Sequence, residues 1–240
     1  MLSSLRTAAS GGPVLFPQWA RVVMCSTFLP TGSVDRELEG WLGELADCPG
    51  CRVLPDLSAA VLLLLDLQRL FIDPSSPAYL QGWSQIAPRC HRLLAAFRAA
   101  GRPVIFTRHL NPPGDDGGVI THFGGRPLRA GDPLAELHSE LVPAPGEPVL
   151  DKARYSAWWR TGLEDHLPVG SVVVLAGVTT HRCVLAAAVG AASRDRLPVV
   201  AADACATRSA ALQLAALRTI AHGFGHVAST REVLRGLRPS

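Results

Sequence analysis

Three side chains with complementary chemistry follow apolar runs of the sequence: Asp66, Lys152 and Cys183. A cysteine can act as a soft nucleophile, a carboxylate can take its proton and later give it to a leaving amine, and a nearby ammonium group favours the thiolate. Each residue has an ordinary alternative, namely a helix cap, a solvated lysine and a small buried cysteine. Their coincidence at the ends of predicted strands favours one catalytic group.

The apolar runs before these residues have the composition of buried parallel strands. Ala60–Leu65 and Val172–Ala176 show no polar alternation, and a short run at 148–150 leads into Lys152. The carboxyl ends of parallel strands lie along one edge of a sheet, where open α/β proteins bind their ligands. We therefore expect the three side chains to share one crevice.

Cys183 is expected in the first turn of a helix that runs from His181 to Ala192, after a break at Gly177. Unpaired N–H groups and the macrodipole at a helix N-terminus stabilise negative charge. This placement predicts that the thiolate is favoured over the thiol.

Strand-like and helix-like segments alternate from about residue 59 to the C-terminus. Other predicted strands are 103–107, 197–202 and 225–229, and predicted helices are 77–100 (broken at Pro88), 161–167, 209–222 and 232–237. This order predicts an α/β fold, a three-layer α/β/α Rossmann-like sandwich with a mostly parallel six-stranded sheet. Residues 111–133, rich in Gly, Pro and Asp, form a long loop of the kind that covers a site.

The chain before this alternation divides into two parts. Residues 1–17 are predicted to be a disordered leader, and residues 18–58 an N-terminal arm that precedes the main domain at 59–240. The arm contains an amphipathic helix with these apolar positions at helical spacing: Val34, Leu38, Trp41, Leu42 and Leu45. The first 34 residues contain no Asp or Glu, a composition that also fits an organellar targeting peptide.

Composition argues against several classes of protein. The 240 residues are 48% hydrophobic and 18% charged, which suits one substantial core, and a net charge of +3 with scattered arginines predicts no nucleic-acid partner. No apolar stretch reaches ~18–20 residues, so no membrane span is expected. Six irregularly spaced cysteines favour reduced thiols and a cytoplasmic protein: Cys25, Cys48, Cys51, Cys90, Cys183 and Cys205. Cys48 and Cys51 have the spacing of half a zinc site or a redox pair, but no second ligand pair follows, and a surface turn is the simpler interpretation.

Three segments resemble the signature segments of the isochorismatase-like cysteine hydrolases: 63–71 (LLLDLQRLF), 150–158 (LDKARYSAW) and 176–184 (AGVTTHRCV). This superfamily includes nicotinamidases, N-carbamoylsarcosine amidases, biuret hydrolases and isochorismatases. The resemblance extends over about residues 59–235. It implies a Rossmann-like sandwich, an Asp66–Lys152–Cys183 triad and a homo-oligomer, either dimer or tetramer.

The resemblance also implies an unusual backbone. Relatives with this motif have a cis peptide bond five residues before the cysteine, which here is Val178–Thr179. In the family this bond directs the N–H of Thr179, together with that of Cys183, at a developing oxyanion.

Two differences from the patterns of the family reduce the number of reactions to be expected. Isochorismatases that cleave a vinyl ether resemble the segment Lys152–Ala157, but many of them lack the cysteine, so Cys183 favours covalent amide chemistry. Nicotinamidases bind a metal through an Asp-x-His pair after the second strand. Here Thr107 replaces that Asp before His109, and Asp115 stands where a further His is expected. No metal or other cofactor is predicted.

The residues beside the triad are candidate substrate contacts: Gln68, Phe71, Arg154, Tyr155, Trp158 and, from the long loop or a second subunit, His122. Arg154 could bind a substrate carboxylate bidentately. Core packing suits the aromatic residues equally well, and Gln68 could instead hydrogen-bond nearby backbone. His181 is a poor candidate base for Cys183, because side chains at i and i+2 diverge on a helix.

The favoured hypothesis is a cytoplasmic, metal-independent cysteine hydrolase acting on a small amide, carbamoyl or lactam substrate. One alternative is vinyl ether hydrolysis of the isochorismatase type. The other is a non-catalytic protein that binds a partner through its N-terminal arm.

Overall fold

The computed structural model describes residues 34–51, 53–123 and 125–237. The predicted leader at 1–17 and most of the targeting segment lie outside these residues. The elements are, in order, α2 (Val34–Glu44), η1 (Pro49–Cys51), β1 (Val61–Leu65), α3 (Arg69–Ile72), α4 (Trp83–Ala99), β2 (Val104–His109), η2 (Gly118–Phe123), η3 (Pro133–Ala135), β3 (Val149–Lys152), α5 (Leu163–His166), β4 (Val172–Val178), η4 (Thr180–Val184), α6 (Leu185–Ala192), β5 (Leu197–Ala206), α7 (Ala210–Gly223), β6 (His226–Ala228) and α8 (Thr230–Gly236).

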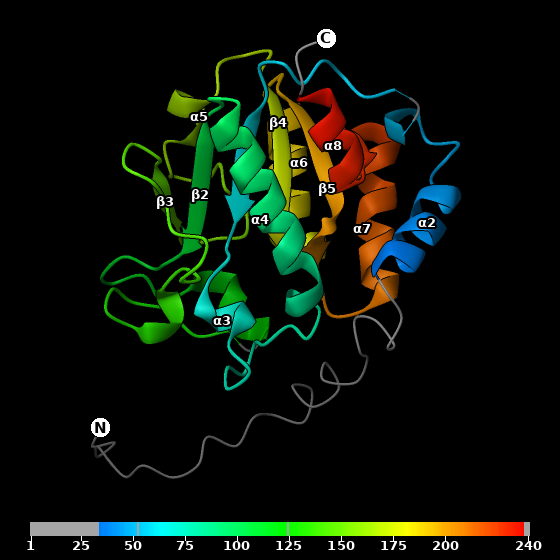
Figure 1. Ribbon diagram of the computed structural model, residues 1–240. Helices are drawn as coiled ribbons and strands as arrows, with labels where there is room; N and C mark the ends of the chain where they lie inside the picture. Colours follow the sequence, from blue (N-terminus) through cyan, green and yellow to red (C-terminus); the bar gives the residue numbers. More distant parts are fainter. Residues whose placement is uncertain (1–33, 52, 124, 238–240) are drawn as a thin grey trace, which may run out of the picture.

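The six strands form one parallel sheet in the order β3-β2-β1-β4-β5-β6. Figure 1 shows α4 and α8 in front of this sheet and α6 behind it. The predicted three-layer α/β/α sandwich is confirmed, with a sheet that is parallel throughout. The chain runs outward from β1 to β3 and then returns to place β4 on the other side of β1. The switch point of the fold therefore lies between β1 and β4.

The central strands are buried on both faces. All five residues of β1 are buried, and Val173–Ala176 of β4 have no exposed surface. Because helices cover both faces of the sheet, these strands need continuous apolar runs rather than alternation. This is why their positions could be predicted from composition alone.

The expected amphipathic helix of the N-terminal arm is present as α2. Its Leu38, Trp41 and Leu45 are buried in the same hydrophobic core as the central strands. Glu44 forms an exposed ion pair with Arg218 of α7 (2.8 Å), which adds little to stability. The burial of the apolar face holds α2 in place, and the division into arm and domain stays a prediction.

Helix α4 differs from the expected helix over 77–100 in its start and in its continuity. It begins at Trp83 and runs through Pro88 without a break. Proline removes the hydrogen bond to the carbonyl four residues earlier, here that of Ser84, and both residues are exposed. The opposite face buries Ile86, Leu93 and other apolar residues of α4, which holds the helix continuous across the proline.

The close packing of α6 on Trp158 gives a stability prediction. A Cβ at Gly190 would lie 2.2 Å from the Trp158 ring, and the ring is held by a hydrogen bond from its Nε1 to Ala187 O (2.9 Å). We expect Gly190→Ala to lower the free energy of unfolding by about 1–3 kcal/mol through overpacking. Urea denaturation measures this change.

The matched control is Gly40→Ala in the interior of α2, where no atom lies within 4 Å of the position that the new methyl group would take. This change should be neutral or stabilising by up to about 1 kcal/mol, because alanine has the higher helix propensity. Equal effects of the two substitutions would contradict the packing argument.

Among the described helices, none is long and apolar enough to cross a lipid bilayer.

Candidate active site

The structure brings Asp66, Lys152 and Cys183 together at the carboxyl edge of the sheet. Asp66 directly follows β1, Lys152 is the last residue of β3, and Cys183 lies in η4 after β4. Because β1 and β4 are neighbours, Asp66 and Cys183 meet at the switch point. Strand β2 separates β3 from β1, so the long lysine side chain is needed to reach across it.

The Lys152 ammonium group contacts both other members of the group. Its Nζ lies 2.7 Å from Asp66 Oδ2 and 3.4 Å from Cys183 Sγ, and it donates a third bond to the Arg154 carbonyl (3.1 Å). The Asp66 and Lys152 side chains have no exposed surface. The ammonium thus has one ion pair with Asp66 and two hydrogen bonds, to Cys183 and to Arg154, so the buried charge is not left without partners.

Asp66 is held in an uncommon conformation. Its φ is +53°, in the left-handed region that a non-glycine residue rarely adopts. The Thr107 hydroxyl donates to Asp66 Oδ1 (2.7 Å), and the Asp66 N–H donates to the Thr107 carbonyl (3.2 Å). The positive φ therefore ends the strand and turns the carboxylate into the crevice.

Cys183 does not lie at the N-terminus of an α-helix, where the sequence predicted it. Thr180–Val184 form a π-helical turn, and α6 begins only at Leu185. Burial raises the pKa of the Cys183 thiol to about 12, and the Lys152 ammonium opposes only part of this rise. The prediction of a favoured thiolate is wrong, because the sulfur is enclosed rather than exposed to solvent.

Lys152 keeps its positive charge although its side chain is buried. Burial lowers the pKa of Lys152, but the negative charge of Asp66 and the interaction with Cys183 more than reverse this, so the pKa lies above its usual value. At neutral pH Lys152 is therefore an ammonium and Cys183 a protonated thiol, which can also donate a hydrogen bond to Asp66.

The backbone before Cys183 has the expected cis peptide bond at Val178–Thr179. Just before it, Gly177 has a φ of +124°, and a Cβ there would lie 2.2 Å from the Leu65 carbonyl oxygen. Only glycine permits this close approach of β4 to β1, next to Asp66. The hydroxyls of Thr179 and Thr180 are buried with no hydrogen-bond partner among the described residues.

Comparison with known proteins shows the family of the chain. The family model for the isochorismatase domain matches residues 60–232. The chain belongs to the isochorismatase family.

Named relatives and solved structures cover most of the chain. It is 31% identical over 183 residues to maleamate amidohydrolase of Pseudomonas putida, which covers 74% of this chain and 86% of that protein. It is 33% identical over 181 residues to phenazine biosynthesis protein PhzD1 of Pseudomonas aeruginosa, covering 73% and 84%. The crystal structure of a cysteine hydrolase from Pseudomonas syringae is similar with a TM-score of 0.70 at 29% identity, covering 77% of this chain and 94% of that chain. The chain is an isochorismatase-like hydrolase, so the alternative of a non-catalytic protein is set aside.

Several predicted substrate contacts of this isochorismatase-like hydrolase have structural partners instead. The Gln68 amide is fully buried and bonds the backbone of His109 and Ala135 (2.6–3.0 Å). Trp158 is 7% exposed and packs on α6, while Phe71 is partly buried against the core. These contacts support the loops around the site.

Arg154 and His122 lie in the surrounding loops. The Arg154 guanidinium pairs with Asp115 (3.1 Å) and lies over the Trp159 ring (4.9 Å), so a protein carboxylate already occupies it. This ion pair and hydrogen bonds lower the pKa of Asp115 to about 2. His122 is exposed in η2, and none of the described contacts joins it to the triad.

The tripeptide Thr107-Arg108-His109 has a role that the sequence did not reveal. Thr107 binds the Asp66 carboxylate, and Arg108 pairs with Asp151 (2.7 Å). Burial, with help from the Lys152 charge, lowers the pKa of His109 to about 4, so its ring is neutral at physiological pH. The alternation of side-chain direction along β2 could have revealed this role, because it turns residues 107 and 109 to the same face of the sheet.

Two arginines beside the site were also missed. Arg182 precedes Cys183, and Arg208 follows the carboxyl end of β5; both are half-buried. Burial and the charge of Arg182 lower the pKa of Arg208, which places the two guanidinium groups within electrostatic reach of each other. Arg182 stacks on the Tyr155 and Phe123 rings (5.4 and 6.0 Å). Within the described part of the chain, neither arginine has a carboxylate partner.

Tyr155, a predicted substrate contact, does lie beside Arg182. Its hydroxyl is buried and has no hydrogen-bond partner among the residues described. Tyr155, His181, Arg182 and Leu185 line part of a surface hollow that continues along α6. A buried hydroxyl without a partner costs about 1–3 kcal/mol, which a polar ligand would offset.

Proposed function

We propose that this isochorismatase-family chain is a cysteine amidohydrolase that cleaves the C–N bond of a small amide, carbamoyl or lactam substrate through a thioester. The observation that supports this most strongly is the position of Lys152 Nζ, which contacts both the Asp66 carboxylate and the Cys183 sulfur in a site closed to solvent. If Lys152 and Asp66 formed only a structural ion pair, the pair would not require a thiol in contact with the ammonium.

In the first half of the proposed reaction, the Cys183 thiol transfers its proton to Asp66 while the sulfur attacks the substrate carbonyl carbon. The Lys152 ammonium stabilises the thiolate as it forms. The resting thiol has a pKa of about 12, so proton transfer accompanies attack rather than preceding it. The N–H groups of Thr179 and Cys183 receive the oxyanion of the tetrahedral intermediate.

The intermediate then loses its amine. Asp66 returns the proton to the nitrogen and the C–N bond breaks, which leaves a thioester on Cys183. Ammonia or an amine departs from an amide or carbamoyl substrate, whereas the new amine of an opened lactam stays attached to the acyl group. In the second half, Asp66 takes a proton from a water molecule that attacks the thioester carbonyl. Collapse of this second intermediate breaks the C–S bond and releases the acid, and the proton held by Asp66 passes to the departing sulfur, which regenerates the thiol.

The experiment that tests this function is a screen of small amides, carbamoyl compounds and lactams for ammonia or amine release. A substrate found in this way should leave a covalent adduct on Cys183 in acid-quenched samples, identified by peptide mass spectrometry. Turnover without any adduct, even in a variant with slowed deacylation, would argue against a thioester.

Arg182 and Arg208, which have no carboxylate partner in the described part of the chain, favour a substrate that carries a carboxylate. Two half-buried cations without a described counterion form a site for a small anion, since a guanidinium binds a carboxylate in bidentate fashion. The similarity to a protein named maleamate amidohydrolase supports this class, because maleamate contains both an amide and a carboxylate.

We expect Arg208→Met to raise the KM for an acidic amide by on the order of 30-fold or more, which corresponds to about 2 kcal/mol of lost binding. The KM for a neutral amide of similar size should change little. Steady-state kinetics on both substrates measures the difference. The control is Arg235→Met, an exposed arginine in the last turn of α8 that should affect neither KM. Equal losses on acidic and neutral substrates would exclude a carboxylate contact.

Vinyl ether hydrolysis is the second candidate function. It is favoured by the segment Lys152–Ala157 and by the family model that matches the chain. This reaction needs an acid, for which Asp66 would serve, and it does not need the Cys183 nucleophile. The predicted assembly into a dimer or tetramer applies to both candidates and stays a prediction.

A further inference from the structure

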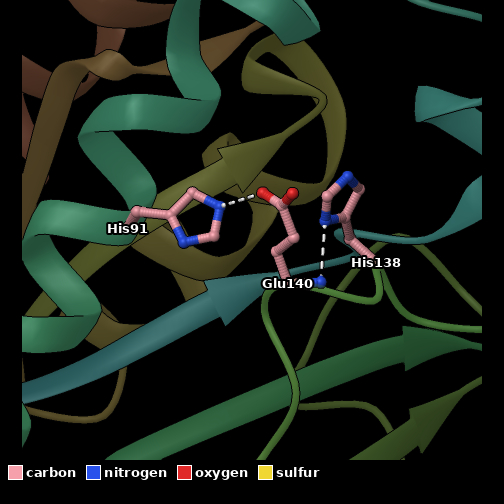
Figure 2. A group of neighbouring side chains, drawn as sticks. All are labelled: His91, His138 and Glu140. Atoms are coloured by element: carbon pink, nitrogen blue, oxygen red, sulfur yellow. Dashed lines mark hydrogen bonds and ion pairs between the residues drawn. The ribbon is translucent and has the colours of Figure 1, made fainter.

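Three side chains with metal-binding atoms form a cluster outside the catalytic group. His91 comes from α4, and His138 and Glu140 from the turn after η3. One ligating atom from each residue lies within 4.8 Å of the other two. Figure 2 shows the two imidazole rings on either side of the Glu140 carboxylate.

The contacts inside the cluster leave lone pairs available. Nε2 of His91 lies 3.3 Å from Glu140 Oε2, yet it is buried and makes no hydrogen bond with any described residue. The Glu140 N–H donates to Nδ1 of His138 (3.2 Å), so Nδ1 carries the lone pair of that neutral ring. A metal ion could take over this lone pair in place of the long hydrogen bond.

The turn that carries His138 is held firmly by the protein. The His138 N–H donates to the Leu67 carbonyl (2.8 Å), and the Leu141 N–H closes the turn by donating to the His138 carbonyl (3.0 Å). The His138 ring packs on Trp83 of α4, with ring centroids 5.1 Å apart. Both imidazoles are half-buried, while the Glu140 side chain is exposed and can move.

We propose that His91, His138 and Glu140 bind a divalent transition metal ion of the zinc class. Two imidazole nitrogens and one carboxylate suit Zn²⁺ and its neighbours, whereas Mg²⁺ and Ca²⁺ prefer oxygen ligands throughout. In a tetrahedral zinc site with bonds of 2.0–2.2 Å, neighbouring ligand atoms are about 3.3–3.5 Å apart. The His91–Glu140 pair already has this spacing (3.3 Å). The His138 ligand atom lies within 4.8 Å of both, so side-chain rotation has to close only the remaining gap.

Such an ion would connect α4 to the turn at 138–140. That turn is bonded to Leu67, the residue after Asp66, so the metal would stabilise the segment that carries the carboxylate without entering the reaction. The sequence predicted no metal site, because His91 lies far from the other two ligands along the chain. This inference does not depend on the proposed amidohydrolase activity, since its test measures binding.

The test is a titration of metal-free protein with Co²⁺ and Zn²⁺. The background is Cys48→Ala/Cys51→Ala, which removes the two half-buried thiols at and beside η1. We expect one high-affinity ion per chain by calorimetry, visible d–d absorption from Co²⁺ without thiolate charge transfer, and a higher unfolding midpoint with Zn²⁺ but not with Mg²⁺. Each of His91→Gln, His138→Gln and Glu140→Gln should weaken binding at least tenfold.

The matched control is His222→Gln, an exposed histidine in the last turn of α7 that should leave binding unchanged. Glu140→Gln is a safe ligand variant because its side chain is exposed, and its metal-free unfolding midpoint should equal that of the parent. The proposal is overturned if the parent binds no Co²⁺ or Zn²⁺. It is also overturned if the three ligand variants bind as tightly as His222→Gln, or if the Co²⁺ spectrum shows a thiolate ligand.

Discussion

Cys183→Ala is expected to lower the rate of amide hydrolysis by on the order of 10⁴-fold or more, because it removes the nucleophile on which both halves of the proposed reaction depend. The side chain is only 5% exposed, and alanine removes a single atom from it, so the fold should persist. Ammonia release measures the rate, and mass spectrometry should find no adduct in this variant.

The matched control for this substitution is Cys48→Ala, a half-buried cysteine in the arm, which should retain full activity. A comparison of Cys183→Ala with Asp66→Asn separates the two candidate functions. A Cys183→Ala protein that still cleaves a vinyl ether, while Asp66→Asn does not, would favour acid-catalysed ether hydrolysis. Amide hydrolysis that persists in Cys183→Ala would show that covalent catalysis is wrong.

Lys152→Met is expected to lower the free energy of unfolding by about 3–5 kcal/mol, since it leaves the Asp66 carboxylate buried without its counterion. Activity should be lost as well, because the ammonium is the only cation in contact with Cys183 Sγ among the described residues. Urea denaturation, monitored by circular dichroism, measures the stability. The control is Arg218→Met, which breaks the exposed ion pair with Glu44 (2.8 Å) and should cost no more than about 1 kcal/mol.

The double variant Asp66→Asn/Lys152→Met distinguishes lost charge pairing from lost packing. With both charges removed, its loss of stability should be smaller than the sum of the two single losses by at least about 1 kcal/mol. Strict additivity would show that the ion pair is not the source of the effect. Lys152 is the only lysine in the chain, so no other lysine can replace it.

The fold could be predicted because its signals are local. Continuous apolar runs occur where helices cover both faces of a parallel sheet, and the alternation of strands and helices leads to the three-layer sandwich. The polar residues at strand ends, Asp66, Lys152 and Cys183, then had to lie on one edge. The cis bond at Val178–Thr179 came from the family resemblance, because the local sequence carries no physical signal for it.

The errors arose where tertiary contacts outweigh local preference. A proline normally breaks a helix, but the buried face of α4 holds it continuous through Pro88. Cys183 was expected at a helix N-terminus with a favoured thiolate, whereas it lies in a π-helical turn whose enclosure raises the thiol pKa. Burial depends on what the rest of the chain places around a residue, and no short segment contains that information.

The positions of the strands and the three polar residues at their carboxyl ends could be predicted from short segments, because hydrophobic periodicity is a local property. Three features depend on packing across the fold: Thr107 binds Asp66, Arg182 and Arg208 have no carboxylate partner among the described residues, and His91 lies beside His138 and Glu140. These contacts join residues from different elements, and their distances depend on how the whole sheet and its helices pack.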